Sequence, residues 1–315
     1  MQEIIPPISV HELEKELLLA QFLRKTNYGG NDVFITDYHR TPQIVKEIGR
    51  LRELSFRNAG GGTGKDCDLD DYDTAEQPYQ QLFVWNPKDK EITGGYRYYV
   101  FGKAQNGFTD FSKLATARLF SFSEKFKKNY LPHIIELGRS FVPPTLQKTG
   151  GSRKGVFALD NLWDGLGALV INNPGIRYFF GKVTMYTHFN QEARNMILYF
   201  LHKYFGDYEN LMVPYEPLQL NMDKKNLDSI FNGNSPREDY KILSSQVRAL
   251  GENIPPLINA YVNLSPTLKT FGTVINRSFG NVEETGIMIT LKDMYLSKIN
   301  RHFSSYSKDY VLPTR

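Results

Sequence analysis

The amino-acid sequence predicts an α/β protein whose mixed central sheet is flanked by helices. Segments rich in branched and aromatic residues alternate along the chain with segments of helical periodicity, which indicates layered strands and helices. An early pair of strand-like segments flanks a short polar turn, so at least one pair of neighbouring strands is antiparallel. With 315 residues, of which 41% are hydrophobic and 13% aromatic, the chain can bury a sizeable core.

The N-terminal part predicts two helices and three strands. A short helix begins after Ser9, the segment NDVFITD is typical of a strand, and a longer helix begins after Thr41 with Pro42 at its first position. That longer helix repeats its apolar residues at helical spacing and stops in NAGGGTG. QLFVW and ITGGYRYYVF then flank residues 86–90, a polar turn with a proline, and so predict a hairpin.

The remaining elements continue this alternation. After the strand IELGRSFV come a helix striped with leucines, the strand IRYFFGKVTM and a helix that Asn190 caps. PPLINAYVNL and TGIMITL predict a late helix and strand. Residues 206–254 are the least periodic. We therefore expect one domain over residues 1–315, with a core of about 30–205 and 255–293 and an insertion or cap between them.

Charge and cysteine content exclude several protein classes. The chain has 38 lysines and arginines against 34 aspartates and glutamates, and the net charge of +4 is too small to indicate a nucleic-acid partner. It is compatible with an acidic protein partner, an anionic membrane surface or an ordinary solvated surface. Cys67 is the single cysteine, which excludes an intramolecular disulfide and a multi-cysteine zinc site. No stretch approaches the roughly 18 apolar residues of a spanning helix, so we expect a cytoplasmic protein that touches the inner face of the membrane at most peripherally.

The segment IELGRSFV places Glu136 and Arg139 inside a strand that should be buried. Side chains alternate in a regular strand, so residues three apart face opposite sides. Gly138 between them is typical of a β-bulge, which would bring both charged groups to one side and free a backbone N–H to bind a developing oxyanion. We therefore assign these three residues to a candidate active site. The alternative is an edge strand with a solvated ion pair.

A glycine-rich, basic loop, TGGSRKG, follows that strand and leads into a helix. Glycines allow a close backbone approach, free N–H groups at a helix start bind anions, and two cations add charge. The loop thus predicts a site for a phosphate or a phosphopantetheine. Its residue order differs from a Walker loop, which disfavours an ordinary nucleoside triphosphatase. The candidate donor-binding residues are Gly150, Gly151, Ser152, Arg153, Lys154 and Gly155.

The acidic run DCDLDDYD does not form a calcium-binding EF-hand loop. Such a loop needs a glycine at its sixth position and a bidentate glutamate at its twelfth, where this chain has Asp71 and Gln77. The carboxylates therefore either cap local backbone or bind the amine of a substrate. Arg97, between tyrosines in the hairpin, needs an acidic partner if it is buried, and Glu136 or the acidic run can supply one.

Other catalytic patterns do not stand out in the sequence. The histidines, His133 and His188 among them, lack metal-ligand spacing, so no metal site is expected. There is no evident Ser-His-acid or Cys-His pattern, and Ser140 lacks the G-x-S-x-G context of a nucleophile elbow.

The succession LRELSFR, glycine-rich loop, DLDDYD, LFVW, ITGGYRYY and IELGRSFV resembles the GNAT-fold N-acyltransferases that use acyl-carrier-protein thioesters. YFFGKVTM, PPLINAYVNL and TGIMITL resemble the ornithine-lipid and glycine-lipid synthase branch most, and the acyl-homoserine-lactone synthases more distantly. The resemblance covers most of residues 40–205 and returns at 255–292. The loop GGGTGKDCDLDD is a departure, because it is richer in glycine than the tryptophan-bearing loop of the homoserine-lactone enzymes. Residues 207–254 have no counterpart.

The resemblance implies a GNAT-like sheet whose splayed central strands admit a pantetheine arm, with its phosphate near residues 151–155. It implies site roles for residues on the central strand, the preceding strand, the acidic run and the first long helix. The catalytic candidates are Glu136, Arg139, Arg97 and the bulge residue Gly138, and the substrate-binding candidates are Arg52, Asp70, Asp73 and Ser140.

We expect an N-acyltransferase that moves a (3-hydroxy)acyl chain from acyl carrier protein to the α-amine of glycine or ornithine in aminolipid synthesis. No bound cofactor is implied, because acyl carrier protein or coenzyme A brings the thioester as a substrate. Amide formation needs a neutral amine, an aligned carbonyl and a site for the oxyanion. Glu136 either accepts the amine proton or only orients Arg139 and the carrier. Basic residues that suit an acidic carrier protein are Lys125, Lys127, Lys128, Arg153 and Lys154.

Two alternatives compete with this expectation. One is another enzyme on the same fold, either an acyl-homoserine-lactone-like signal synthase or a coenzyme-A-dependent acetyltransferase. The other is a non-catalytic acyl-carrier or membrane-surface binding protein, because a fold does not dictate function.

Overall fold

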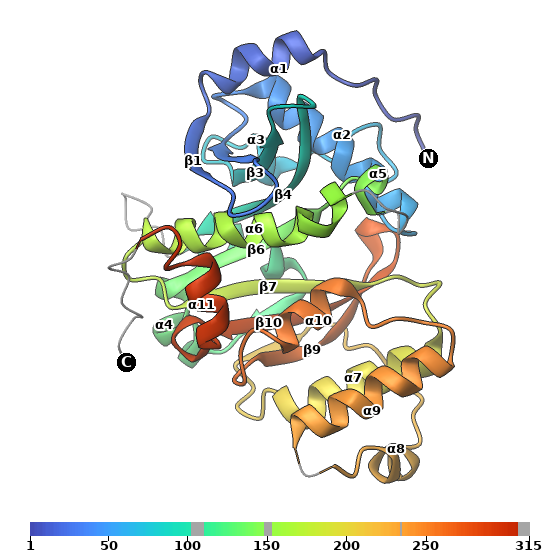
Figure 1. The fold of residues 1–315 in the computed structure, drawn as a ribbon. Coiled ribbons are helices and arrows are strands. Elements are labelled where there is room, and N and C mark those ends of the chain that lie inside the picture. The colour runs from blue at the N-terminus through green and yellow to red at the C-terminus, as the bar shows by residue number, and fades with distance from the viewer. Residues whose placement is uncertain (102–109, 148–152, 234, 308–315) are drawn as a thin grey trace.

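The computed structural model describes residues 1–101, 110–147, 153–233 and 235–307. Its centre is an eight-stranded sheet with the strand order β1-β2-β3-β4-β6-β7-β10-β9 (Figure 1). All neighbouring strands are antiparallel except β6 and β7, so the predicted mixed sheet is confirmed. The strands are β1 (Gln21–Lys25), β2 (Asp32–Thr36), β3 (Gln80–Asn86), β4 (Glu91–Val100), β6 (Ile134–Phe141), β7 (Tyr178–Met185), β9 (Lys269–Asn276) and β10 (Val282–Thr290), with β5 (Phe120–Phe122) and β8 (Met212–Pro214) paired apart from them.

Most helices lie where the sequence predicts them. Ser9 and Asn190 cap α1 and α7 through their side-chain oxygens, as expected. Thr41 precedes α2 but makes no side-chain cap bond, because its hydroxyl is hydrogen-bonded to that of Thr36. The helices are α1 (Val10–Leu17), α2 (Pro42–Asn58), α3 (Asp71–Thr74), α4 (Glu124–Asn129), α5 (Pro144–Gln147), α6 (Arg153–Ile171), α7 (Gln191–Phe205), α8 (Lys224–Ile230), α9 (Pro236–Ala249), α10 (Pro256–Val262) and α11 (Leu296–His302).

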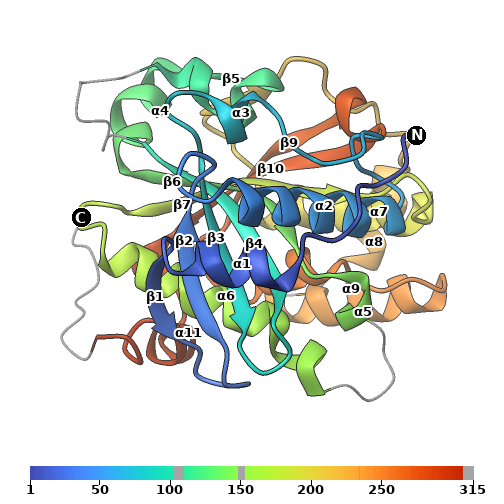
Figure 2. The same ribbon diagram turned by 90° about the horizontal axis from the view of Figure 1, so that it is seen from above.

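The two faces of the sheet bury separate sets of side chains. Along β3, Leu82 and Val84 pack in the core beneath α6, whereas Phe83 and Trp85 pack against α2, as the two-residue period of a strand requires. Helices α6, α7, α10 and α11 cover one face, and α1, α2 and α4 cover the other (Figures 1 and 2). Each fully buried side chain of this kind stabilises the fold by about 1.5–3 kcal/mol. A path between the two faces therefore needs a gap in the sheet itself.

That gap lies between β6 and β7. These parallel strands pair only from Ile134 with Tyr178 to Leu137 with Gly181. Beyond this point β6 stays with β4 and β7 stays with β10, so the two halves of the sheet diverge. A Cβ at Gly181 would lie 2.3 Å from the Leu137 carbonyl oxygen, so the last pair before the gap requires a glycine. The predicted splayed central strands are confirmed.

Residues 206–254 contain more regular structure than their weak periodicity predicts. Helices α8 and α9 lie beside α7 (Figure 1), and Leu243 and Val247 of α9 are fully buried in the same core as the α6 side chains. Their spacing of four residues places them on one face of the helix. The segment thus extends the helical layer on the α6 face. None of the helices in the described ranges combines the length and the apolarity that a bilayer crossing needs.

Candidate active site

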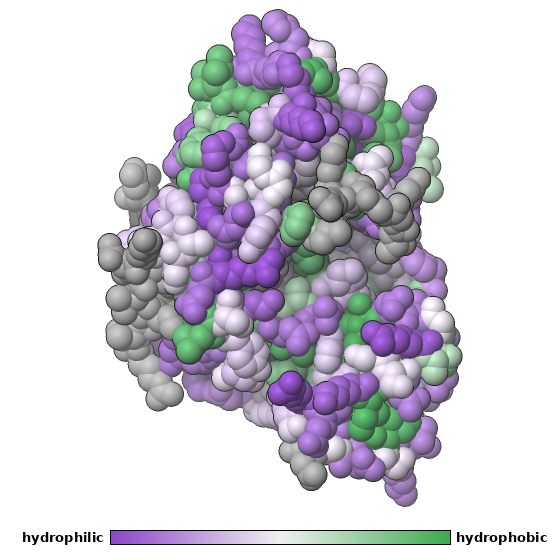
Figure 3. All heavy atoms as spheres, viewed as in Figure 1, coloured by the Kyte–Doolittle hydropathy of each residue, from purple (hydrophilic) through white to green (hydrophobic). Residues whose placement is uncertain are grey.

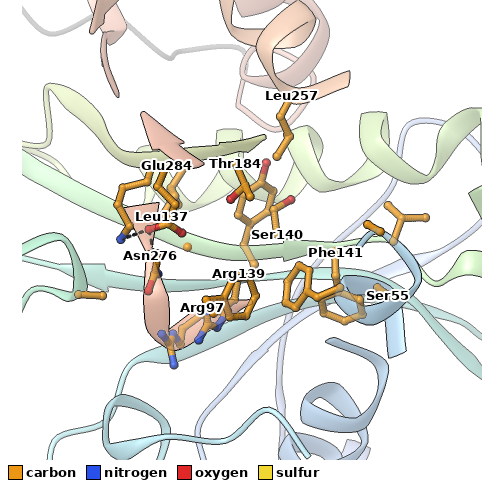
Figure 4. Close-up of a pocket in the computed structure, with 18 of the residues that line it drawn as sticks. Ser55, Arg97, Leu137, Arg139, Ser140, Phe141, Thr184, Leu257, Asn276 and Glu284 are labelled. Atoms are coloured by element: carbon orange, nitrogen blue, oxygen red, sulfur yellow. Dashed lines mark hydrogen bonds and ion pairs between the residues drawn. The ribbon is translucent and has the colours of Figure 1, made fainter. Parts of the chain in front are cut away.

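A cavity of about 820 Å³ lies where the sheet divides. Residues 136–142 of β6 and the adjoining loop all line it. Leu159 of α6 and Leu257 of α10 border it on one face, and Phe56 of α2 and Arg97 of β4 border it on the other. In Figure 4, Arg97 and Arg139 lie on one side of the β6 ribbon and Leu257 lies on the other. The cavity therefore connects the two faces of the sheet, and its volume is in the range of ordinary ligand sites.

The β6 strand carries the predicted bulge. Gly138 pairs with Arg97 and Phe141 pairs with Gly95, so β6 has one more residue than β4 between these two pairs. The residue in the left-handed conformation is Arg139, with φ of +50°, rather than Gly138. The expectation of a bulge is confirmed, but the glycine is not the residue that takes up the strained backbone. Such a conformation is unusual for a non-glycine residue and is typical of functional sites.

Three arginines and three aspartates form a charge cluster against the α2 face of the bulge. We name it the Arg–Asp cluster. It is electrically neutral, and its side chains range from fully buried to 22% exposed. The ion pairs are Arg52 with Asp68 (3.1 Å) and Asp73 (2.9 Å), Arg97 with Asp70 (2.6 Å) and Asp73 (2.9 Å), and Arg139 with Asp68 (3.0 Å) and Asp70 (3.8 Å).

The charges of the Arg–Asp cluster compensate one another. Burial opposes ionisation of Asp73, but Arg52 and Arg97 hold the pKa of that carboxyl well below its usual range. Burial also opposes ionisation of Arg97. The negative charges of Asp73 and Asp70 outweigh this effect, so the pKa of Arg97 lies above its ordinary value. Asp70 also caps α3 by accepting a hydrogen bond from the Tyr72 N–H. The acidic run thus caps local backbone, as expected, and it supplies the acidic partners of Arg97.

Glu136 lies on the same face but outside this cluster. It is 2% exposed and makes no ion pair with any described residue. Its carboxylate accepts hydrogen bonds from the Tyr79 hydroxyl, the Thr116 hydroxyl, and the backbone N–H groups of Ala115 (3.1 Å) and Thr116 (2.8 Å). Four donors fill the acceptor positions of a carboxylate. Burial, and next the negative charge of Glu136, raise the pKa of Tyr79 well above its ordinary value, so this phenol acts as a hydrogen-bond donor.

The structure brings most of the predicted site residues to one cavity. Glu136, Gly138, Arg139, Arg97, Asp70 and Ser140 line it. Arg52 and Asp73 are not among the lining residues and support the wall from behind. Of the donor-loop residues, Gly150, Gly151 and Ser152 lie outside the described residues. Arg153, Lys154 and Gly155 form the first turn of α6, and their side chains also lie outside the description.

The basic residues considered for carrier binding do not form one surface. Lys125, Lys127 and Lys128 lie on α4, whereas Arg153 and Lys154 open α6 beyond α5. Figures 1 and 2 place α4 and α5 at opposite ends of the molecule. Two of the α4 lysines are also paired with acids, Lys125 with Glu209 and Lys127 with Glu124.

Several lining residues carry no sequence motif. Tyr79 precedes β3, and Ala115 and Arg118 are the first and last residues of a 3₁₀ turn, Ala115–Arg118. Lys182 and Glu284, from β7 and β10, lie 3.9 Å apart, and Glu284 also accepts a hydrogen bond from Asn276 (3.1 Å; Figure 4). The only sequence signal for Tyr79 was its position directly before an apolar strand, which is common to many structural residues.

Comparison with known proteins agrees with this geometry. The acetyltransferase (GNAT) domain family matches residues 51–153, which include β3, β4 and β6. A glycine N(alpha)-acyltransferase of Phocaeicola vulgatus is 53% identical over 312 residues, which are 98% of this chain and 95% of the relative. The chain belongs to this family of N-acyltransferases. A glycine N(alpha)-acyltransferase of Bacteroides thetaiotaomicron is 50% identical over 310 residues, 98% of this chain and 92% of the relative.

Solved structures of acyl-homoserine lactone synthases match the acyltransferase at lower similarity. LasI is 11% identical, with 91% of this chain and 100% of LasI covered at a TM-score of 0.39. BjaI, described as coenzyme-A-dependent, is 14% identical. The match covers 51% of this chain and 70% of BjaI, with a TM-score of 0.28. The family membership makes this chain an enzyme of acyl transfer, which answers the non-catalytic alternative raised by the sequence.

Gly138 gives a direct test of the cavity. A Cβ built on this residue meets no atom within 4 Å, so a side chain there points into open space without disturbing the fold. We expect Gly138→Val to retain the wild-type melting temperature, because valine suits a strand. It should lower kcat/KM for acyl transfer by about 10²-fold, because it misplaces the thioester. The kcat/KM of Gly138→Ala should lie between those of the wild type and Gly138→Val. Full activity of Gly138→Val would place the reacting carbonyl elsewhere.

Proposed function

We propose that this acyltransferase moves a (3-hydroxy)acyl chain from the thioester of acyl carrier protein to the α-amine of glycine, in aminolipid synthesis. The cavity that joins the two faces of the sheet carries the proposal, because it lets donor and acceptor approach one carbonyl from opposite sides. Both relatives are named as glycine acyltransferases, which supports glycine as the acceptor.

The donor is proposed to enter on the α6 face. There the cavity is bordered by the apolar side chains of Leu159 and Leu257, which suit a pantetheine arm and the start of an acyl chain. The thioester carbonyl would then lie at the gap, beside residues 139–140. Neither residue is paired in register with β4 or β7 within the described strands. A backbone N–H of this bulge is our candidate for binding the oxyanion.

The reaction then follows from these positions. The neutral amine of the acceptor attacks the thioester carbonyl carbon, a C–N bond forms, and the carbonyl oxygen becomes an oxyanion. Collapse of this intermediate breaks the C–S bond and expels the carrier thiolate. The amine nitrogen loses a proton, and the thiolate takes one up to become the free thiol. Glu136 is proposed to assist by its negative charge near the amine, together with the Tyr79 hydroxyl that it holds.

The charges that line the cavity favour glycine over ornithine. Among the described lining residues, Asp70 is paired with two arginines, and Glu284 is bound by Lys182 and Asn276. Glu136 already accepts four hydrogen bonds and is the carboxylate assigned to the α-amine, so it does not serve a second ammonium group. Ornithine carries a second ammonium group that would need a carboxylate of its own, and a buried unpaired charge is costly. Ornithine remains the second acceptor to be tested.

Membrane contact belongs to the same proposal, because an acylated amino acid is amphipathic. Leu18 and Leu19, between α1 and β1, and Phe22 of β1 are exposed. Figure 3 shows apolar residues gathered at this end of the molecule. Exposed apolar clusters of this kind bind apolar partners, including membrane surfaces. The cluster is our candidate for a peripheral contact.

The test is mass spectrometry of the purified enzyme with a long-chain 3-hydroxyacyl carrier protein, or the same acyl-coenzyme A, and either glycine or ornithine. We expect release of the carrier thiol together with N-acylglycine, faster from the carrier protein than from coenzyme A and faster with phospholipid vesicles than without. Faster turnover of the coenzyme A thioester would overturn the proposed donor. Amide formation with ornithine but not glycine would overturn the proposed acceptor.

A further inference from the structure

Two charged side chains that line the cavity have no partner of opposite charge among the described residues. Arg97, Arg139 and Asp70 belong to the neutral Arg–Asp cluster, and Lys182 faces Glu284. The charges left over are the negative charge of Glu136, held only by neutral donors, and the positive charge of Arg118. The cavity wall thus presents one uncompensated charge of each sign.

These two charges lie on one wall. The N–H groups of Ala115 and Thr116, at the start of the 3₁₀ turn, donate to Glu136, and Arg118 ends the same turn. The Arg118 guanidinium lies 4.5 Å from the centroid of the Tyr72 ring. Tyr72 packs edge-on against Tyr79 at 5.2 Å, and the Tyr79 hydroxyl donates to Glu136. A continuous row of side chains therefore leads from Arg118 to Glu136.

Arg118 suits the role of an anion ligand. It is exposed while it lines the cavity, so a small polar molecule can reach it from solvent. Contact with the Tyr72 ring holds the guanidinium at the cavity wall, and no acidic side chain of the described residues forms an ion pair with it. A planar guanidinium binds carboxylates through two parallel hydrogen bonds, which lysine cannot reproduce.

We propose that Arg118 and Glu136 form the binding site of a zwitterionic α-amino acid, with the substrate carboxylate on Arg118 and its amino end directed toward Glu136 and Tyr79. This inference rests on the proposed function and deepens it, because it explains how the acceptor is recognised. The opposite signs of the two residues match the two ends of the acceptor. The arrangement presents the amine to the α2 face of the gap, opposite the side where the donor is proposed to enter.

Glycine and glycinamide separate the two ends of the acceptor, because glycinamide keeps the amine but has no carboxylate. The experiment measures kcat and KM for both, with a saturating 3-hydroxyacyl carrier protein, in wild type, Arg118→Met and Arg118→Lys. We expect Arg118→Met to lower kcat/KM for glycine by about 10- to 100-fold, mainly through KM, as the loss of one charge-assisted pair predicts. Glycinamide turnover by Arg118→Met should change less than about twofold. The kcat/KM of Arg118→Lys for glycine should lie between those of the wild type and Arg118→Met.

Lys127→Met is the matched control. Lys127 also lies over an aromatic ring, 4.4 Å from the centroid of Phe111, but is not among the residues that line the cavity. It should leave the glycine-to-glycinamide ratio at the wild-type value. An equal loss of glycine and glycinamide turnover in Arg118→Met, or no loss at all, would overturn the assignment of Arg118. A wild-type enzyme that acylates neither compound would instead overturn the proposed function, so the two failures are distinguishable.

Discussion

Replacing Glu136 with glutamine is expected to lower kcat/KM for glycine acylation by about 10²–10³-fold. The substitution removes the one negative charge, among the lining residues that the structure describes, that no cation neutralises, and general acid–base assistance alone contributes on this scale. It also turns one carboxylate oxygen into an amide NH₂, which would face donors such as the Thr116 or Tyr79 hydroxyl. We therefore expect a lower melting temperature as well.

A neutral acceptor separates the electrostatic role of Glu136 from its structural role. Hydroxylamine is largely uncharged near neutral pH, so it needs neither attraction to a carboxylate nor loss of a proton before attack. Glu136→Gln should lower hydroxylamine turnover by only about tenfold, since deprotonation before attack and charge attraction no longer contribute and only the proton lost after attack remains. Equal losses for glycine and hydroxylamine would show that Glu136 acts only by holding Tyr79 and the 3₁₀ turn.

Glu284→Gln is the control for this measurement. Glu284 is also a buried carboxylate that lines the cavity, but Lys182 and Asn276 already bind it. Its replacement keeps a hydrogen-bond acceptor for Asn276 and should lower turnover of both acceptors less than about fivefold. The comparison isolates the effect of the uncompensated charge.

The sequence predicts local features of the site but not its pairings. The bulge in IELGRSFV follows from one glycine between two charges, which is information within a few residues. The partners of those charges come from elsewhere: Arg97 bonds Asp70 across 27 residues, and Glu136 bonds Tyr79 across 57. Which acid meets which arginine depends on the packing of the loop after α2 onto the sheet. From the sequence, Glu136 and the acidic run were both candidate partners of Arg97. Only the acidic run, through Asp70 and Asp73, forms ion pairs with it in the structure.

The elements that sequence analysis missed have weak or interrupted patterns. Strand β1 is short and has a register shift between Phe22 and Arg24. Strand β9 has a register shift against β10 around Gly272, whose φ of +87° is incompatible with a regular strand. In α9 few apolar residues are buried, Leu243 and Val247 among them, and polar residues surround them. Arg118 was missed for a related reason, since a 3₁₀ turn has no periodic signature and an isolated arginine is usually a surface residue.

The second large effect concerns stability: Arg52→Met is expected to lower the free energy of unfolding by about 3–5 kcal/mol. Arg52 is fully buried, and its removal leaves Asp68 and Asp73 short of a cation in a place where water does not reach. Arg277→Met is the control, because Arg277 is 75% exposed and lies 3.7 Å from the equally exposed Glu216. A surface pair of this kind is worth less than about 1 kcal/mol. Urea denaturation followed by circular dichroism measures both.

The pH dependence of that loss distinguishes an unpaired charge from a simple packing defect. In the wild type the pKa of Asp73 is lowered, so its contribution is present above the ordinary carboxyl pKa of 3.8 and is lost as the pH falls through the lower value of the folded protein. Without Arg52 the pKa of Asp73 rises, so protonation relieves the buried charge of the variant at a pH at which Asp73 of the wild type is still ionised and paired. The stability difference between the two proteins should therefore shrink as the pH is lowered from about 7 to about 4. A difference that stays constant over this range would mean that Arg52 stabilises the wall of the cavity by packing alone.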